Sequence, residues 1–431
     1  MSTVVSPTGT RTPVGPYTLP DVAPRRPSHL AASTDRIGSI DIIRGAVMVL
    51  MAIDHVRVFA GVPAGGPTPG VFFTRWVTHF CAPAFIFLAG TSAFLYGEKV
   101  RDRGALARFL LTRGAWLVLL ELTVLRFAWT FNLDYAHYAL AGVIWVIGWC
   151  MILMAALVYL PVTAIGAIGV AIIALHNVTD LFRAELVRAA STSSLSWLWQ
   201  ILYFGGNIAL SARGEDGPQL AVLYSIIPWI GVMAAGYAFG RVLRLEPARR
   251  RQVCLALGIG AMATFLVLRG FNVYGDPRPW GHAAQRAAAQ GISPPPAFLQ
   301  FLATNKYPAS LLFLLMTLGP TILLIPLLER ARGPLARVLT VFGRVPFFYY
   351  VLHIPLIHLV FVGLSIARFG TVIPWMTTNH PMFVPPPPPG YTYSLTALYT
   401  ITLVVVTALY FPCRWFAGLK ARRTDRWLSY L

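Results

Sequence analysis

The sequence predicts an all-α fold, a polytopic integral membrane bundle of about ten transmembrane helices with both termini in the cytoplasm. Composition is the first evidence: 56% of the 431 residues are hydrophobic and only 12% are charged, whereas a soluble domain carries about a quarter charged residues. The formal net charge is +19, but the Lys and Arg residues lie between long apolar runs instead of along one face. We therefore expect the lipid bilayer as a partner and no nucleic acid.

The predicted helices follow from apolar segments that approach the roughly 20 residues needed to cross a bilayer. The fifth segment is the shortest, and Pro161 makes its connection with the fourth tight. The ten segments are 38-60, 72-97, 114-131, 139-160, 162-176, 219-241, 252-272, 308-328, 339-363 and 393-414.

Three regions follow from this pattern. Residues 1-37 are rich in Pro, Ser and Thr and predict a disordered cytoplasmic tail. Residues 38-418 form a single predicted transmembrane domain, and residues 419-431 form a basic cytoplasmic tail.

Positive charges predict the orientation, because cytoplasmic loops carry more Lys and Arg than outer loops. If the N-terminal tail is cytoplasmic, the segments on its side hold 22 Lys and Arg residues, and the loops on the other side hold eight. The outward loops 177-218, 273-307 and 364-392 are also the longer ones. Both termini are therefore predicted on the cytoplasmic side.

Ionisable residues inside the spans mark the candidate site, because a charge within a membrane needs a function or a buried partner. Asp54 and His55 lie near the outer end of the first segment, and His79 lies at nearly the same depth in the second. Two imidazoles and a carboxylate at one level can carry the proton transfers of acyl or phosphoryl chemistry. We predict these three residues to be catalytic, with Asp54 orienting a histidine base.

Further polar side chains fall in the same outer half of the bundle. Lys306 and Arg126 are candidates for binding substrate or stabilising an oxyanion, and His353 and His358 join them. The alternative for either of these histidines is a side chain satisfied within the helix bundle. No sequence motif or cysteine pair indicates a metal, and we expect none.

The sequence also resembles a known family. The runs RIGSIDIIRGAVMVLMAIDHVRVF (36-59) and RWVTHFCAPAFIFLAGTSAFLY (75-96) resemble bacterial members of the heparan-alpha-glucosaminide N-acetyltransferase catalytic-domain family. Residues 223-240, 303-320 and 343-359 extend the match.

The resemblance implies a multi-span acyltransferase that moves an acetyl group from cytosolic acetyl-CoA, or another acyl-CoA, to a sugar or other small acceptor across the membrane. The family's catalytic histidine lies in the loop between the first two spans, but residues 60-73 contain no histidine. An asparagine of the family's first motif matches Asp54, and an aspartate of its second motif matches His79. The lysosomal member acts on heparan sulfate, which a bacterium would not be expected to degrade, so we expect a different acceptor here. The expected location is a bacterial cytoplasmic (inner) membrane.

A mechanism follows from combining the resemblance with the polar residues. Acyl-CoA would enter from the cytoplasm with its phosphates near Arg44 and Arg344, and Asp41 lies on the same helix face as Arg44. A structural ion pair is the alternative for Asp41 and Arg44. His79 or His55 would then deprotonate the acceptor.

The competing function is a membrane transporter or lipid-handling protein that uses the same buried charges. A scaffold that has lost the chemistry is a third interpretation. The sequence leaves open whether the protein forms a homodimer.

Overall fold

The computed structural model describes residues 1–3, 37–66, 68–211, 214, 217–281, 295–382, 384–423 and 425–429. The chain divides into two units, Met1–Arg36 and Ile37–Leu431, and all helices and strands below belong to the second. Apart from residues 1–3 and Ile37, the predicted N-terminal tail lies outside the described residues.

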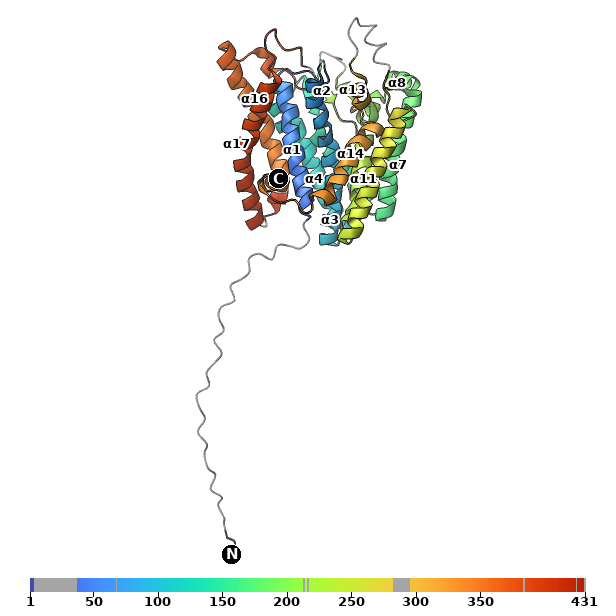
Figure 1. Ribbon diagram of the computed structural model, residues 1–431, viewed down its shortest axis with the longest axis vertical. Helices are drawn as coiled ribbons and strands as arrows, with labels where there is room; N and C mark the ends of the chain where they lie inside the picture. The colour runs from blue at the N-terminus through green and yellow to red at the C-terminus, as the bar shows by residue number, and fades with distance from the viewer. Residues whose placement is uncertain are drawn as a thin grey trace. The chain divides into compact units, whose positions relative to one another are not determined.

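The second unit is a bundle of long helices that lie side by side (Figure 1). Seven helical segments of the described chain are long and apolar enough to cross a membrane, so this is a multi-pass membrane protein. They are Pro69–Val100, Val162–Phe182, Ile226–Leu243, Pro247–Gly270, Leu311–Leu328, Pro346–Phe369 and Leu395–Arg422.

The first half of the chain supplies the helices that carry most of the candidate site. Several of them continue into short 3-10 or π-helical turns without a break in the rod. The elements are α1 (Gly38–Phe59), α2 (Pro69–Trp76), η1 (Val77–Phe80), α3 (Cys81–Val100), α4 (Arg103–Leu120), η2 (Glu121–Leu125), α5 (Arg126–Thr130), α6 (Val143–Leu157), α7 (Val162–Leu175), η3 (His176–Phe182), α8 (Arg183–Thr192), α9 (Ser196–Trp199) and η4 (Gln200–Phe204).

The second half completes the bundle. Its elements are α10 (Ile226–Leu243), α11 (Pro247–Gly270), α13 (Ala297–Leu302), α14 (Leu311–Leu328), α15 (Pro334–Arg344), α16 (Pro346–Phe369), η6 (Pro374–Thr377), α17 (Leu395–Arg422) and η7 (Arg426–Ser429).

A small sheet departs from the all-α prediction. Strands β1 (Tyr138–Ala141), β3 (Gln219–Val222) and β2 (Gly206–Ala209) lie in that spatial order, with β3 parallel to β1 and antiparallel to β2. The strands replace the residues predicted to begin the fourth and sixth spans. A short apolar run cannot be assigned to helix or strand from hydropathy alone, which is why the sequence pattern missed them.

The predicted ninth span, 339-363, is also corrected. The chain breaks at Val345, whose φ of −132° is not helical, and α16 begins at Pro346. Proline lacks the amide hydrogen of a helix interior and disfavours a helical conformation in the residue before it. The break separates α15 from α16.

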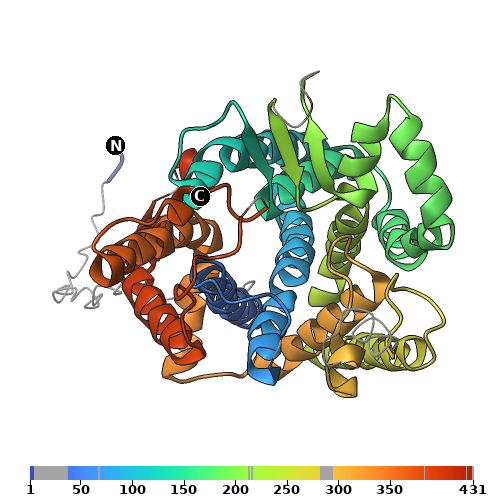
Figure 2. The same ribbon diagram turned by 90° about the horizontal axis from the view of Figure 1, so that it is seen from above.

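Close backbone contacts hold α1 in the middle of one half of the bundle. A Cβ on Gly45 would lie 1.9 Å from the carbonyl oxygen of Leu339 on α15, so only glycine permits this approach. Helix α1 also contacts α3, α14, α16 and α17, and Figure 2 shows it between the C-terminal helices and α3. Side chains near the end of α1 therefore face several helices at once.

Candidate functional site

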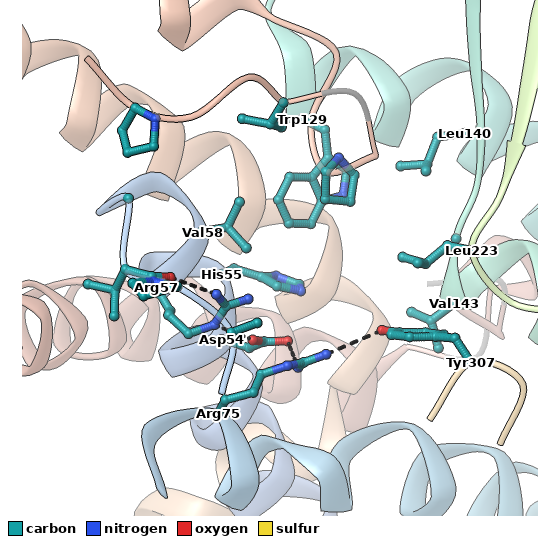
Figure 3. A pocket seen from close by; sticks show the side chains of 18 of the residues that line it. Asp54, His55, Arg57, Val58, Arg75, Trp129, Leu140, Val143, Leu223 and Tyr307 are labelled. Atoms are coloured by element: carbon teal, nitrogen blue, oxygen red, sulfur yellow. Dashed lines mark hydrogen bonds and ion pairs between the residues drawn. The ribbon is translucent and has the colours of Figure 1, made fainter. Parts of the chain in front are cut away.

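A cavity of about 410 Å³ lies beside the last two turns of α1, and we call it the His55 cavity. Figure 3 shows Asp54, His55 and Arg75 beside it, with the hydroxyl of Tyr307 directed toward Arg75. Its lining combines polar side chains with an apolar wall from residues at or next to the sheet and from the prolines at 385–387. The described residues that line it include Asp54, His55, Arg57, Arg75, Glu121, Trp129, Leu140, Leu223, Tyr224, Tyr307, Tyr350, Trp375 and Pro385.

His55 is held by a second histidine. Its Nδ1 lies 2.7 Å from Nε2 of His353 on α16, and the two rings stack with centroids 4.8 Å apart. Nδ1 of His353 in turn lies 2.6 Å from the backbone carbonyl oxygen of Tyr350. The ring of Trp129 packs edge-on against His55 at 4.7 Å. These contacts fix the orientation of the His55 ring.

The hydrogen-bond pattern assigns the protons of this relay when both rings are neutral. A carbonyl oxygen only accepts, so Nδ1 of His353 carries its proton and donates it to Tyr350. Nε2 of His353 then accepts, and Nδ1 of His55 must be the donor. Nε2 of His55 is left without a proton, on a ring that lines the cavity. This is the tautomer that a general base requires.

Asp54 does not orient either histidine. Its carboxylate accepts hydrogen bonds from Nε of Arg57 at 3.0 Å and from Nη1 of Arg75 at 2.6 Å. The expected role of Asp54 as the partner of a histidine base is corrected here, because two guanidinium groups occupy its oxygens. Arg75 also donates to the hydroxyl of Tyr307 at 3.4 Å.

Glu121 brings a second carboxylate to the His55 cavity. It begins the π-helical turn η2, a type of distortion that often occurs at functional sites. Oε2 accepts hydrogen bonds from the amides of Ile144 and Trp145 at 2.8 and 3.1 Å, and so caps α6. Oε1 is buried and has no partner among the described residues. The side chain is completely buried within the protein.

His79 lies in a different cavity from His55. This second cavity, of about 470 Å³, also contains Lys306, and we call it the Lys306 cavity. Arg75 and Tyr307 line both cavities and form the wall between them. The predicted common layer of polar residues is therefore divided into two neighbouring sites.

Arg126 has a structural contact pattern. It is fully buried, and its guanidinium donates to the carbonyls of Tyr138, Asn132 and Asp134. The predicted oxyanion role is corrected on this ground, because these hydrogen bonds direct the side chain into the 132–138 loop.

His358 is likewise engaged by backbone. Its ring nitrogens lie 3.1 Å from the carbonyl oxygen of Ala128 and 2.9 Å from that of Met376. The ring stacks on Phe131 at 3.7 Å. His358 is thus the bundle histidine of the alternative interpretation, whereas His353 contacts a site residue directly.

The three residues predicted to bind acyl-CoA phosphates lie at the other end of α1 or beside it. Arg44 donates to the carbonyl of Leu88 and to the hydroxyl of Ser92 on α3, and lies 3.8 Å from Asp41. Arg344 is exposed at the end of α15. The contacts of Arg44 and Asp41 fit the structural ion pair that the sequence left open.

Comparison with known proteins now decides the family. The profile described as heparan-alpha-glucosaminide N-acetyltransferase, catalytic, matches residues 36–272, which is more than half of the chain. The chain belongs to this family. A search of curated proteins gives no match. The resemblance seen in the sequence is confirmed, and acetyltransferase-type chemistry in a membrane bundle follows from it.

The family match covers only part of the site. His55, Arg75 and Glu121 lie within the matched residues, while His353 and Tyr307 lie beyond them. Glu121, Tyr307 and Arg75 are not among the residues predicted for the site from the sequence. The one available signal was a glutamate inside an apolar segment, which is costly unless buried with partners.

Proposed function

We propose that this family member transfers an acyl group from acyl-CoA to a hydroxyl or amine of an acceptor in the His55 cavity, with His55 as general base. The observation that carries the proposal is the relay from the Tyr350 carbonyl through His353 to His55. It leaves Nε2 of His55 free to take a proton beside a cavity large enough for a small acceptor group.

The proposed reaction needs one base and no covalent enzyme intermediate. Nε2 of His55 removes the acceptor proton while the acceptor oxygen or nitrogen attacks the thioester carbonyl. The tetrahedral intermediate then collapses, the bond to sulfur breaks, and the thiolate of CoA takes the proton back from His55. His353 stabilises the transient imidazolium because it accepts the hydrogen bond from Nδ1.

Tyr307 is our candidate for stabilising the oxyanion. Burial raises the pKa of its phenol, but the charges of Lys306 and Arg75 outweigh burial and lower the pKa below its ordinary value. A more acidic phenol is a stronger hydrogen-bond donor. Tyr307 replaces Arg126 in this role.

Glu121 fits a binding role in the same cavity. Its Oε1 has no partner among the described residues, so an acceptor hydroxyl or amine would satisfy it. The acceptor would then be oriented between Glu121 and His55. Arg44, Asp41 and Arg344 remain candidates for contacts with CoA phosphates at the opposite end of α1.

We further propose that α1, the rod from Arg103 to Thr130 and α6 also cross the membrane, giving ten crossings and two cytoplasmic termini. The 22 residues of α1 rise about 33 Å, enough for the hydrocarbon layer. Its four charged residues, Asp41, Arg44, Asp54 and Arg57, all have ion-pair partners inside the protein. The proposed location is a bacterial cytoplasmic membrane.

The test is transfer of labelled acetyl from acetyl-CoA by the purified full chain, to water or to added amines and hydroxyls. We expect His55→Ala to lower the rate by about a hundredfold or more, the usual contribution of a general base. The matched control is His137→Ala, since His137 is exposed on a loop. Acetyl-CoA that stays intact while vesicles containing the protein take up solute would instead indicate a transporter.

A further inference from the structure

The Lys306 cavity has no part in the proton transfer proposed above. It is lined by Trp76 at the end of α2, by His79 in η1, by Arg278, and by residues 303–307 before α14. Helix α2, which contains Trp76, and helix α13, which precedes residues 303–307, lie at the same end of the bundle (Figure 1). The side chains of this cavity indicate the kind of ligand that would satisfy them.

Lys306 is the first indication. Its side chain belongs to a residue that is 6% exposed, and its ammonium lies 5.8 and 5.3 Å from the ring centres of Tyr224 and Tyr307. Within the described chain no carboxylate lies within ion-pair distance of it. A buried ammonium without a direct ion-pair partner is costly, and aromatic faces compensate only partly.

Three further polar atoms on residues that line the cavity are buried without a protein partner in the part of the chain that the structure describes. They are Nε1 of Trp76, Nδ1 of His79 and Oγ1 of Thr304. An indole nitrogen can only donate, and a hydroxyl or an imidazole can donate as well. Unsatisfied buried polar atoms are rare in native proteins, so their concentration here indicates a missing acceptor.

The residues that line the Lys306 cavity carry positive charge, as a site for an anion would. The described residues that line the cavity include Arg75, Arg278 and Lys306 but no Asp or Glu. Asp54 stands behind Arg75, but it is shared with Arg57, so this ion cluster already carries an excess positive charge. Asp276, two residues before Arg278, forms an ion pair with Arg269.

We propose that the Lys306 cavity binds an oxyanion, a phosphate or a carboxylate, with Lys306 as its principal contact. Resting on the proposed function, this group is the anionic part of the acceptor. The shared wall of Arg75 and Tyr307 places such a group next to the cavity that contains His55. The acceptor would then be an acidic molecule, either soluble or the headgroup of a lipid.

Binding can be tested without turnover. We would measure the thermal stability of the detergent-solubilised full chain in inorganic phosphate and in chloride at equal ionic strength. Lys306→Met removes the charge and keeps the length, and Lys99→Met is the matched control because Lys99 is exposed on α3. We expect phosphate to stabilise the wild type and Lys99→Met. We expect its affinity for Lys306→Met to be lower by about tenfold or more.

A second readout separates this site from a structural lysine. Without ligand, Lys306→Met should melt at a higher temperature than the wild type, because an uncompensated buried charge has been removed. Trp76→Phe should also weaken phosphate binding, which keeps the test decisive if the lysine variant does not fold. His55→Ala should still bind phosphate, so loss of acetyl transfer alone leaves this proposal standing.

The source of the oxyanion is tested by comparing nanodiscs of phosphatidylglycerol and phosphatidylcholine. Stabilisation by phosphatidylglycerol alone would support a lipid headgroup, and stabilisation by soluble phosphate would support a soluble acidic acceptor. The proposal is overturned if neither stabilises the wild type, or if phosphate stabilises Lys306→Met as strongly as it does the wild type.

Discussion

The histidine relay makes a prediction about His353, which contacts His55 but does not itself transfer the proton. In His353→Leu, Nδ1 of His55 loses its acceptor, and the ring is free to turn or to change tautomer. In His353→Gln, the side-chain amide oxygen can reach nearly the position of Nε2 and accept the same hydrogen bond. The two substitutions therefore separate the hydrogen bond from the bulk of the ring.

The magnitude follows from one buried hydrogen bond that becomes charge-assisted when His55 is protonated. Such bonds contribute about 1.5–3 kcal/mol, and each 1.36 kcal/mol of barrier is about tenfold in rate. His353→Leu should thus lower kcat by about tenfold to a hundredfold. His353→Gln should retain a large part of the wild-type kcat. KM for acetyl-CoA should change little, since His353 lies behind His55 and is fully buried.

The assay is acetyl transfer at saturating and limiting acetyl-CoA, with size-exclusion profiles to confirm folding. A positioning role also predicts a changed pH dependence of kcat in His353→Leu, which a purely structural role would not produce. The reasoning is refuted if folded His353→Leu retains the wild-type kcat and pH profile, or if Gln is no better than Leu.

Four other predictions concern individual residues. Glu121→Gln should raise KM for the acceptor by roughly tenfold with little effect on kcat, because a charged hydrogen-bond acceptor is lost; an unchanged KM in kinetic assays would contradict its binding role. Arg126→Gln should lower the free energy of unfolding by about 3 kcal/mol or more, and with it the melting temperature, because buried carbonyls lose their donor; a thermal scan that shows no shift would count against the structural role. Gly45→Val should prevent the close contact of α1 with α15, and well-folded variant protein in size-exclusion chromatography would be the opposing result. Burial lowers the pKa of His380 to about 4, so the unfolded chain binds this proton first, and His380 alone should contribute a fall of about 1 kcal/mol in stability from pH 7 to pH 5.5; His380→Gln should reduce the pH dependence of melting by that share, and an unaltered slope would contradict it.

Much of the bundle could be predicted from the sequence because long apolar runs have few structural alternatives in a membrane. The spans beginning near 252 and 393 correspond closely to α11 and α17. The errors occurred where another interaction decided the local structure. Residues 220-222 are apolar but belong to strand β3, which pairs with β1 and β2, a contact between distant segments that hydropathy cannot show.

The positions of the candidate site residues were predictable only in part, for a similar physical reason. Depth along a helix brought His55, His79 and Lys306 to one end of the bundle, but depth does not specify which face a side chain occupies. His55 meets His353 across α1 and α16, while His79 packs edge-on against Phe313 on α14 and lines the neighbouring cavity. The pairing of Asp54 with Arg57 has the i, i+3 spacing of a helix and could have been foreseen.

The position of the acyl group tests the account most directly. A cryo-electron microscopy map of the full chain with a non-hydrolysable acetyl-CoA analogue would show where the reactive carbonyl lies. We expect the carbonyl in the His55 cavity, with Nε2 of His55 facing the space where an acceptor would attack. An acyl group lying against Lys306, or outside both cavities, would contradict it.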